Sequence, residues 1–583
     1  MKRRALAAVR FLAWLAPVAV AGWSAAVVIG APAERLPGPR RPQLPSSVSS
    51  RTPADLVILN ARIYTAAVPF RAQAMAVSHG RIVAVGSNQS VASYLGPRTE
   101  IWDIPGRAVL PGLIDSHGHM EGLGEKLAIV DLTGTKSYAE VIARVVARAR
   151  QMPRGDWVLG SGWDQNDWPV EAMPTHDSLS AAVPDHPVSL ERVDGHALLV
   201  NRMALAAARI GRRTEGPAGG LIERDARGEP TGVLVDNAAA LVESVIPKPS
   251  PAERERRLLE AMRACSRAGL TMVHDAGIGR ATLAAYRALL ARDEFPIRIY
   301  AMASATDSLT EDLLRLGREL GDRFTLRAIK VFYDGALGSR GAFLSEPYSD
   351  RPVHFGIERT QVDDLARLAA RAREAGFQMR VHAIGDLANT RVLDAYERAF
   401  DDGPHPELRW AIEHCQVVRP GDIRRFARDG IVASMQPTHA TSDGPWAQER
   451  LGPVRIRWSY AWRKFLSAGV RFASGSDFPV ESEKPLLGLY AAITRRDLDR
   501  KLPRAGWRPE ERLSREEALK SFTIWGAYLA FQEQDLGSLE TGKLADFVVV
   551  DPDPFEGRPE ALLGCVVMKT VVGGQVVWNA EKP

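Results

Sequence analysis

Short apolar runs, each followed by a helical stretch, recur through the middle of the chain. Such runs are typical of strands that are covered on both faces. A first run lies at Val109, and seven more follow at 271–275, 297–302, 325–334, 377–382, 408–414, 431–436 and 470–477. Eight strand–helix units predict an α/β fold, a (β/α)8 barrel of the TIM type. Its active site is then expected at the carboxyl ends of the strands.

The spacing of these runs is uneven. Too many residues separate the first run from the second for a single helix, so we expect an insertion at about 121–250 on the catalytic face, as a lid or a substrate-binding subdomain. Short β-rich runs fill 54–107, and similar runs return at 536–580. These two ends predict one small β-sandwich domain, with the barrel at 108–535 inserted between them.

The first 33 residues have the pattern of a signal or membrane-anchor segment. Residues 1–10 are basic and 11–31 are almost wholly apolar. An apolar length near 20 residues favours an uncleaved anchor, whereas the small residues Ala31 and Ala33 leave signal cleavage open. The basic flank predicts an exported, extracytoplasmic protein. We expect the Pro/Ser/Arg-rich residues 34–53 to form a disordered linker.

Composition narrows the choice of partners. Hydrophobic residues make up 45% of the chain and charged residues 25%, as in ordinary globular proteins, and the net charge of +5 comes largely from the first 53 residues. Because the body has no basic run with interleaved aromatics, we expect no nucleic-acid partner, a small-molecule substrate, and membrane contact only through the N-terminal segment. The sequence leaves open whether the protein forms a homo-oligomer. The three cysteines are too far apart for a disulfide framework or a cysteine-based zinc site.

Titratable residues stand at or near the ends of several apolar runs. His117 and His119 form an H-x-H pair after the first run, and this spacing can offer two nitrogen donors to one metal ion. The same kind of position is held by Lys330, His382, His414 and Asp477. Any one of them alone is more simply explained as a hydrogen-bonded structural residue. Together they converge on one axial pocket, and burying so many titratable groups without a cation would be costly.

Lys330 needs a separate argument, because an ammonium group is repelled by a divalent cation. A buried lysine with a lowered pKa can react with carbon dioxide to give an anionic carbamate, which can bridge two metal ions. The alternative is a structural lysine that extends to solvent or pairs with Asp334 or Asp275.

Four further residues are candidates for substrate binding. His439 and His274 stand at the ends of barrel strands, and Asp194 and His196 belong to the insertion. Packing or helix capping explains each of them equally well. Trp163 and Trp168 of the insertion could reach the pocket together with Asp194 and His196, but the core of that subdomain is the more expected place for them.

The chain resembles the amidohydrolase superfamily, and within it the amidohydrolase 3 group of YtcJ-like proteins and N-substituted formamide deformylases. The resemblance spans about 54–578 and rests on stretches such as PGLIDSHGH, GSGWDQNDWP, IKVFYDGALGSR, IEHCQ and SGSDFPV. It implies His117 and His119 as first-strand ligands, Lys330 as a carboxylated bridge, and His382 and His414 as ligands of a second metal. It also implies Asp477 as both ligand and proton shuttle.

The chemistry that follows is metal-dependent hydrolysis of a non-peptide C–N bond, of amide or formamide type. One or two divalent ions, most simply zinc, would provide hydroxide at neutral pH, and Asp477 would act as general acid and base. The alternatives are a deaminase, isomerase or lyase on the same barrel, or a non-catalytic exported binding protein.

Overall fold

The computed structural model describes residues 52–169, 171–499 and 501–581. The expected leader at 1–33, and the expected linker at 34–53 except its last two residues, lie outside this range. No helix among the described residues is long and apolar enough to cross a membrane. The chain divides into two compact units: residues 125–250 form one, and the remaining described residues form the other.

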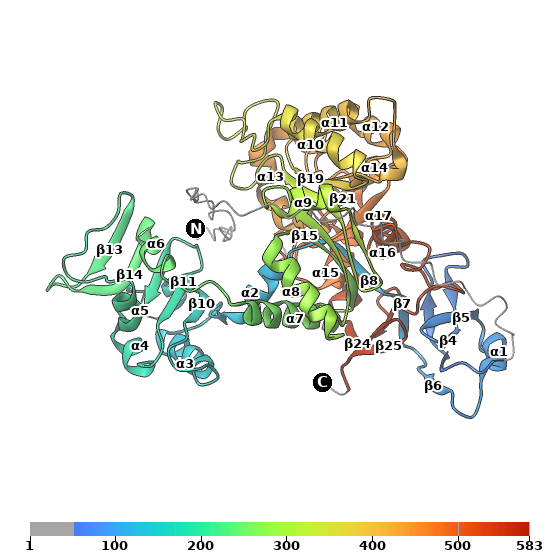
Figure 1. The fold of residues 1–583 in the computed structure, drawn as a ribbon, viewed down its shortest axis with the longest axis horizontal. Coiled ribbons are helices and arrows are strands. Elements are labelled where there is room, and N and C mark those ends of the chain that lie inside the picture. Colours follow the sequence, from blue (N-terminus) through green and yellow to red (C-terminus); the bar gives the residue numbers. More distant parts are fainter. Residues whose placement is uncertain (1–51, 170, 500, 582–583) are drawn as a thin grey trace, which may run out of the picture. The chain divides into compact units, whose positions relative to one another are not determined.

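The larger unit contains a nearly closed parallel barrel of eight strands (Figure 1). In sheet order these strands are β8 (Leu113–Gly118), β15 (Leu270–Ile278), β16 (Arg298–Ser304), β18 (Phe324–Phe332), β19 (Gln378–Ala383), β20 (Ala411–His414), β21 (Val432–Met435) and β22 (Phe472–Ser474). A short strand, β17 (Glu319–Leu320), pairs with β18. The predicted (β/α)8 barrel is therefore confirmed, and every predicted run after the first overlaps one of its strands.

Helices follow the barrel strands. They are α7 (Pro251–Arg267), α8 (Arg280–Ala291), α9 (Leu309–Leu316), α10 (Val362–Glu374), α11 (Asp386–Ala399), α12 (Pro420–Asp429), α13 (Pro437–Arg455), α14 (Trp462–Ser467), α15 (Pro485–Thr494), α16 (Arg515–Ser521) and α17 (Ile524–Leu529). On the amphipathic helix α10, the buried positions Leu365, Ala366, Ala369 and Ala372 follow helical spacing and so form one apolar stripe. Helix α17 packs beneath the barrel, where Ala527 and Ala530 join Ile114, Met272 and Tyr300 in one apolar cluster.

The first predicted run is divided by the structure into two strands. Strand β7 (Ala108–Pro111) pairs with strands of a different sheet, and only β8, after Gly112, belongs to the barrel. A Cβ on Gly112 would lie 2.1 Å from Thr271 Oγ1 of the neighbouring barrel strand. The chain thus crosses from one sheet to the other at a residue with no side chain, and the barrel begins later than the expected residue 108.

Both ends of the larger unit build a β-sandwich, as predicted. One sheet has the order β5 (Arg81–Gly86), β4 (Ala74–Ser78), β1 (Leu56–Leu59), β6 (Glu100–Asp103), and the short helix α1 (Asn88–Val91) follows β5. The other has the order β25 (Gln575–Asn579), β24 (Val566–Val572), β23 (Phe547–Asp551), β7, β2 (Arg62–Tyr64), β3 (Arg71–Ala72). Ile58 and Val77 of the first sheet share one buried cluster with Ile63, Phe547 and Val549 of the second.

The inserted unit has a sheet of its own. Its order is β13 (Gly220–Arg224), β14 (Pro230–Asp236), β12 (Ala197–Val200), β11 (Val188–Arg192), β10 (Val158–Trp163), β9 (Val130–Asp131). The α-helices of this part of the chain are α2 (Met120–Ala128), which enters the unit, α3 (Tyr138–Ala149), α4 (His176–Ala182), α5 (Arg202–Ala207) and α6 (Ala240–Glu243). Trp163 and Trp168 are buried in one cluster with Val141 and Leu190, so these tryptophans are core residues of the unit.

A buried ion pair connects the barrel to the β-sandwich. Arg298 of β16 donates from Nε to Asp546 Oδ2 (2.8 Å) and from Nη2 to Asp546 Oδ1 (3.0 Å). Both side chains are almost fully buried. Asp546→Ala would leave the buried Arg298 with only the mostly exposed Asp322 as a charged partner (2.7 Å), so we expect it to lower the free energy of unfolding by about 3 kcal/mol.

The urea midpoint measures this effect. The matched control is Glu311→Ala, which breaks an exposed pair with Arg371 and should cost less than about 1 kcal/mol. Equal effects of the two substitutions would contradict the structural role of the buried pair.

Candidate metal centre

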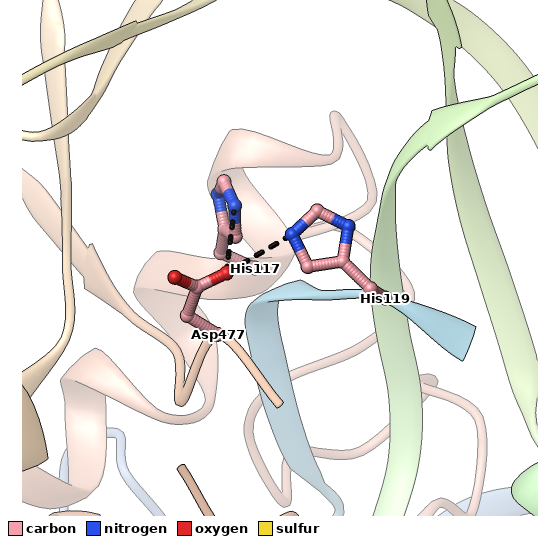
Figure 2. Close-up of side chains that lie close together, drawn as sticks. All are labelled: His117, His119 and Asp477. Atoms are coloured by element: carbon pink, nitrogen blue, oxygen red, sulfur yellow. Dashed lines mark ion pairs between the residues drawn. The ribbon is translucent and has the colours of Figure 1, made fainter. Parts of the chain in front are cut away.

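The end of β8 and the turn after β22 bring three donors together. His119 Nε2 lies 3.0 Å from Asp477 Oδ1, and His117 Nε2 lies 3.4 Å from the same oxygen (Figure 2). One ligand atom from each residue falls within 4.8 Å of the others. His117 is almost fully buried, whereas His119 is partly open to solvent, so solvent can reach the group from the side of His119.

Asp115 holds the two backbone segments that carry these donors. It accepts hydrogen bonds from His117 N (3.0 Å), Ser476 N (3.1 Å) and Ser476 Oγ (2.6 Å). Asp477 N also donates to His117 O (2.7 Å), and His119 N donates to Phe478 O (2.9 Å). Within the described residues no strand pairing joins β22 to β8, so these contacts close the barrel at the point where the donors meet.

A second group of donors shares Asp477. His414 ends β20 and His439 lies in the first turn of α13, and both are buried with a ligand atom within 4.8 Å of each other and of Asp477. His414 Nδ1 lies 2.8 Å from Gln436 Oε1. This contact leaves Nε2 of His414 available on the other side of the ring.

His382 lies beside this second group. Its ring centroid is 4.4 Å from that of His414, and its Nε2 is 3.4 Å from Asp334 Oδ1. Nε2 is buried and has no hydrogen-bond partner in the described part of the chain. A buried nitrogen without a partner is costly, so a bound cation would satisfy it.

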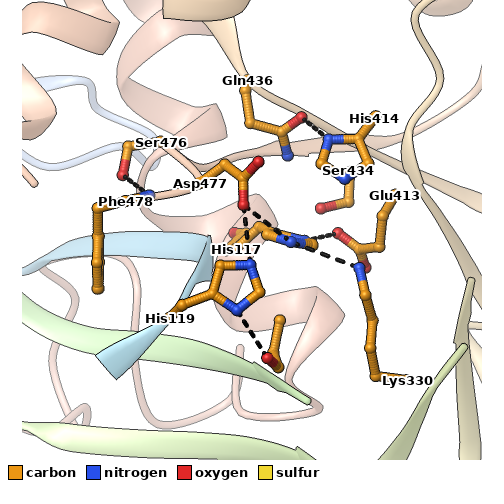
Figure 3. A network of polar contacts seen from close by, with 12 residues as sticks. His117, His119, Lys330, Glu413, His414, Ser434, Gln436, Ser476, Asp477 and Phe478 are labelled. Carbon is orange, nitrogen blue, oxygen red and sulfur yellow. Dashed lines mark hydrogen bonds and ion pairs between the residues drawn. The ribbon is translucent and has the colours of Figure 1, made fainter. Parts of the chain in front are cut away.

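Lys330 points from β18 toward His117. Its Nζ lies 3.5 Å from His117 Nε2 (Figure 3). Burial lowers the pKa of Lys330 to about 8. No ion pair of Lys330 with Asp334 or Asp275 is present among the described residues. Those carboxylates are engaged elsewhere: Asp334 accepts from the amides of Phe343, Ile384 and Gly385, and Asp275 accepts from Met120 N and Tyr286 OH.

Glu413 and Arg380, which the sequence analysis did not single out, support the first donor. Glu413 Oε2 contacts His117 Nδ1, while Glu413 Oε1 accepts from Arg380 Nε. The side chains of Glu413 and Arg380 have no solvent exposure. This carboxylate fixes the His117 ring so that Nε2 faces the other donors (Figure 3), as in carboxylate–histidine–metal arrangements. The sequence does contain a signal for these two residues, because Arg380 and Glu413 are charged residues inside the apolar runs 377–382 and 408–414.

The electrostatics favour the cation-binding protonation states of His117, His414 and Asp477. Burial, together with the charge of Lys330, lowers the pKa of His117 to about 4, and burial with neighbouring His382 holds the pKa of His414 well below its usual value. Burial alone would raise the pKa of Asp477, but the hydrogen bond from His119 and the nearby imidazoles hold it well below the usual range. Neutral imidazoles and an ionised carboxylate are the forms that ligate metals. Burial would lower the pKa of His119 as well, but the hydrogen bond and charge of Asp477 raise it, so a cation would have to displace the proton of His119.

The remaining candidates have different surroundings. His274 lies buried inside β15, 5.0 Å from the Tyr300 ring by centroids, and neither ring nitrogen has a hydrogen-bond partner among the described atoms. In the inserted unit Asp194 pairs with Arg192, and His196 Nδ1 lies 2.7 Å from Asp236 Oδ1. Substrate binding by these three residues stays a prediction, whereas His439 shares a potential metal group with Asp477.

These residues fit one or two divalent cations. Nitrogen and carboxylate donors converge. The Nε2 atoms of His382 and His439 have no hydrogen-bond partner among the described residues, and the centroids of these two rings lie 4.4 and 6.0 Å from that of His414. Histidine and aspartate donors suit zinc, and an incomplete ligand shell leaves a position for water or substrate. The arrangement can therefore activate water beside a substrate.

The chain is similar to known proteins over most of its length. A model described as the amidohydrolase family matches residues 100–578. YtcJ of Bacillus subtilis (strain 168) is 36% identical over 87% of this chain and 96% of its own length. N-substituted formamide deformylase of Arthrobacter pascens is 30% identical over 89% of this chain and 97% of its own. A solved structure of an uncharacterized metal-dependent hydrolase from Pyrococcus furiosus has a TM-score of 0.71 and 29% identity, covering 86% of this chain and 100% of that one.

The role of Glu413 gives a first prediction for the site. Glu413→Gln keeps the shape of the side chain but removes the negative charge opposite His117, so we expect metal affinity to fall by about 10- to 100-fold. Competition with a chromogenic chelator measures this affinity. Glu397→Gln is the matched control, because Glu397 pairs with arginines on the helices outside the barrel. Unchanged affinity in Glu413→Gln would contradict the supporting role.

Proposed function

The chain belongs to the amidohydrolase family, and from this premise we propose that it hydrolyses a non-peptide C–N bond of amide or formamide type. The observation that carries the proposal is the pair of donor groups that share Asp477, built from His117 and His119 on one side and His414 and His439 on the other. The name of the Arthrobacter pascens relative supports a formamide-type substrate.

The chain's own residues would hold one or two divalent ions, in our proposal zinc. His117, His119 and Asp477 would hold one ion, and His414, with His382 or His439, would hold the second. When bound, such an ion acts as a Lewis acid toward a carbonyl oxygen and lowers the pKa of water to about 7.

Lys330 would bridge the two groups as a carbamate. Its neutral Nζ would attack the carbon of carbon dioxide. An N–C bond forms as one C=O π bond gives its electron pair to oxygen, and one proton passes from the nitrogen to solvent water. The lowered pKa of about 8 makes the neutral amine accessible near physiological pH. The product is an anion, which removes the repulsion that an ammonium group would exert on a cation.

Asp477 would move the proton. Its Oδ1 faces His117 and His119, and its Oδ2 is 3.7 Å from His439 Nε2, so the carboxylate lies between the two donor groups. As general base it takes a proton from the attacking water, and as general acid it returns that proton to the leaving nitrogen. The carbonyl carbon gains oxygen from water and loses the amine, which gives an acid and an amine.

Two alternatives come from other classes. A deaminase, isomerase or lyase could use the same donors, because a fold does not determine the reaction. A non-catalytic binding protein would have no use for a buried carboxylate placed between two potential cation sites. Oxygen-18 from labelled water enters the acid product only if the C–N bond is hydrolysed, and a product without the label would contradict the proposal.

We also propose that the protein is exported and either anchored by its N-terminal segment or released after signal cleavage. The support is the basic and then apolar pattern of residues 1–31. Fractionation of cells that express the full chain tests this proposal, and recovery of the protein from the cytoplasm would contradict it.

Substitution of Asp477, the proposed proton carrier, should lower the rate of the reaction while the protein stays folded. We expect Asp477→Asn to lower kcat on an N-formyl amine by about 100-fold or more, because the amide of asparagine cannot accept the proton. Asp364→Asn, a change of an exposed carboxylate on α10, is the control and should leave kcat unchanged. Full activity in Asp477→Asn would rule out the assigned role.

The state of Lys330 can be observed directly. We expect a carbamate signal in the carbon-13 NMR spectrum of zinc-loaded protein supplied with labelled bicarbonate, and no such signal in Lys330→Ala. Because only the neutral amine reacts, carboxylation of the metal-free protein should increase as the pH rises through about 8, the lowered pKa of Lys330. A spectrum identical in the two proteins would leave Lys330 with a structural role.

A further inference from the structure

Phe332 lies at the edge of the donor groups. It ends β18 two residues after Lys330, so both side chains project from the same face of the strand. Lys330 Nζ is 4.9 Å from the centroid of the Phe332 ring, and the His382 ring centroid is 5.3 Å from it. The Phe332 ring is partly exposed and thus forms part of the wall beside the proposed ligands.

Arg359 lies over this ring. Its guanidinium carbon is 5.2 Å from the Phe332 centroid, within the range of a cation–π contact. The backbone beneath it is fixed at the end of β18, because Arg359 N donates to Tyr333 O (2.7 Å) and Thr360 Oγ1 donates to Phe332 O (2.8 Å). The Phe332 ring therefore lies close to both the Arg359 guanidinium (5.2 Å) and the His382 ring (5.3 Å).

Among the described residues, no carboxylate pairs with Arg359. The adjacent Glu358 accepts from Tyr333 OH (2.5 Å) and from Gln361 Nε2 (3.2 Å) instead. Between residues 52 and 581, as far as the structure describes them, no ion pair or side-chain hydrogen bond of Arg359 is present, and Arg359 is exposed. The Arg359 guanidinium thus faces solvent, and its N–H groups have no partner among the described residues. It lies over Phe332, the ring that borders the proposed metal ligands.

We propose that Arg359 binds a carboxylate on the substrate, so that the molecule hydrolysed is an amide or formamide with an acidic group beyond the scissile bond. This inference rests on the proposed function and specifies the substrate class of the same site. The planar guanidinium matches a carboxylate with two parallel hydrogen bonds, and stacking on Phe332 restricts its orientation. Arg359 is a specificity residue rather than a proton carrier.

Matched ligands test the proposal. N-formylglycine, N-formyl-β-alanine and N-formyl-γ-aminobutyrate are compared with their neutral carboxamides, using the zinc-loaded full chain. Calorimetry measures binding to the slow variant Asp477→Asn once elemental analysis shows that this variant holds zinc, and product formation by the unsubstituted chain measures turnover. We expect at least one acid to bind more tightly than its carboxamide, and the difference to shrink as salt concentration rises.

Because a carboxylate can also coordinate a metal ion, substitution of Arg359 decides the source of the preference. We expect Arg359→Ala to weaken binding of the preferred acid by about tenfold or more relative to its carboxamide, through KM rather than kcat. Arg359→Lys should keep part of the preference, since it retains the charge but not the fork. Arg351→Ala removes the same charge from an exposed position of the same loop and should leave the preference unchanged.

The outcomes separate the two proposals. An acid preference that falls in Arg359→Ala but not in Arg351→Ala supports the carboxylate site, even if no formamide is hydrolysed and the proposed reaction is therefore wrong. Equal affinity for acids and carboxamides, or a preference that survives in Arg359→Ala, overturns the carboxylate site even if both kinds of formamide are hydrolysed.

Discussion

The contact of Glu413 with both Arg380 and His117 is the interaction on which the rest of the site depends. It joins three barrel strands, β8, β19 and β20, in the interior, where neither charged side chain reaches solvent. A buried pair of this kind adds little net stability, but losing one partner costs about 3–5 kcal/mol, so the arrangement is strongly specified. At the other end of the barrel, Ala527 and Ala530 of α17 pack in an apolar cluster with barrel residues. The buried polar residue there, Gln378, is hydrogen-bonded, because it accepts from Tyr300 OH and donates to Leu529 O.

Local backbone strain accompanies this arrangement. His414 (φ 77°), Cys415 (φ 47°) and Asp477 (φ 60°) adopt the left-handed region although none of them is glycine. Such conformations cost on the order of 1–3 kcal/mol each and persist only where the surroundings determine them. For Asp477 the surroundings are the hydrogen bonds of Asp115 and the contacts between the β8 and β22 ends. His414 is held by Gln436 Oε1 (2.8 Å), and Cys415 Sγ donates to Ile412 O (3.1 Å). The strain is consistent with donor side chains aimed at a shared point rather than along regular strands.

The sequence was most informative where periodicity and burial coincide. Eight apolar runs predicted the barrel, and similar runs at both ends predicted the sandwich. The boundary inside the first run was missed, because a two-sheet crossing at Gly112 depends on the close approach of Thr271, which no local pattern encodes. Glu413 and Arg380 were also overlooked. Their role in orienting His117 depends on contacts between strands that are distant in sequence. Likewise, the proximity of His439 to Asp477 depends on the path of the chain from the end of β21 into the first turn of α13, which the sequence pattern does not specify.

The metal content of the purified full chain tests most directly whether these residues form a metal centre. The protein would be expressed with zinc available, purified without chelator, and analysed by elemental analysis beside a circular dichroism spectrum that reports folding. The account predicts about two divalent ions per folded chain, held by the two donor groups that share Asp477. A folded protein that carries no metal, and takes up none when zinc is added, would contradict it.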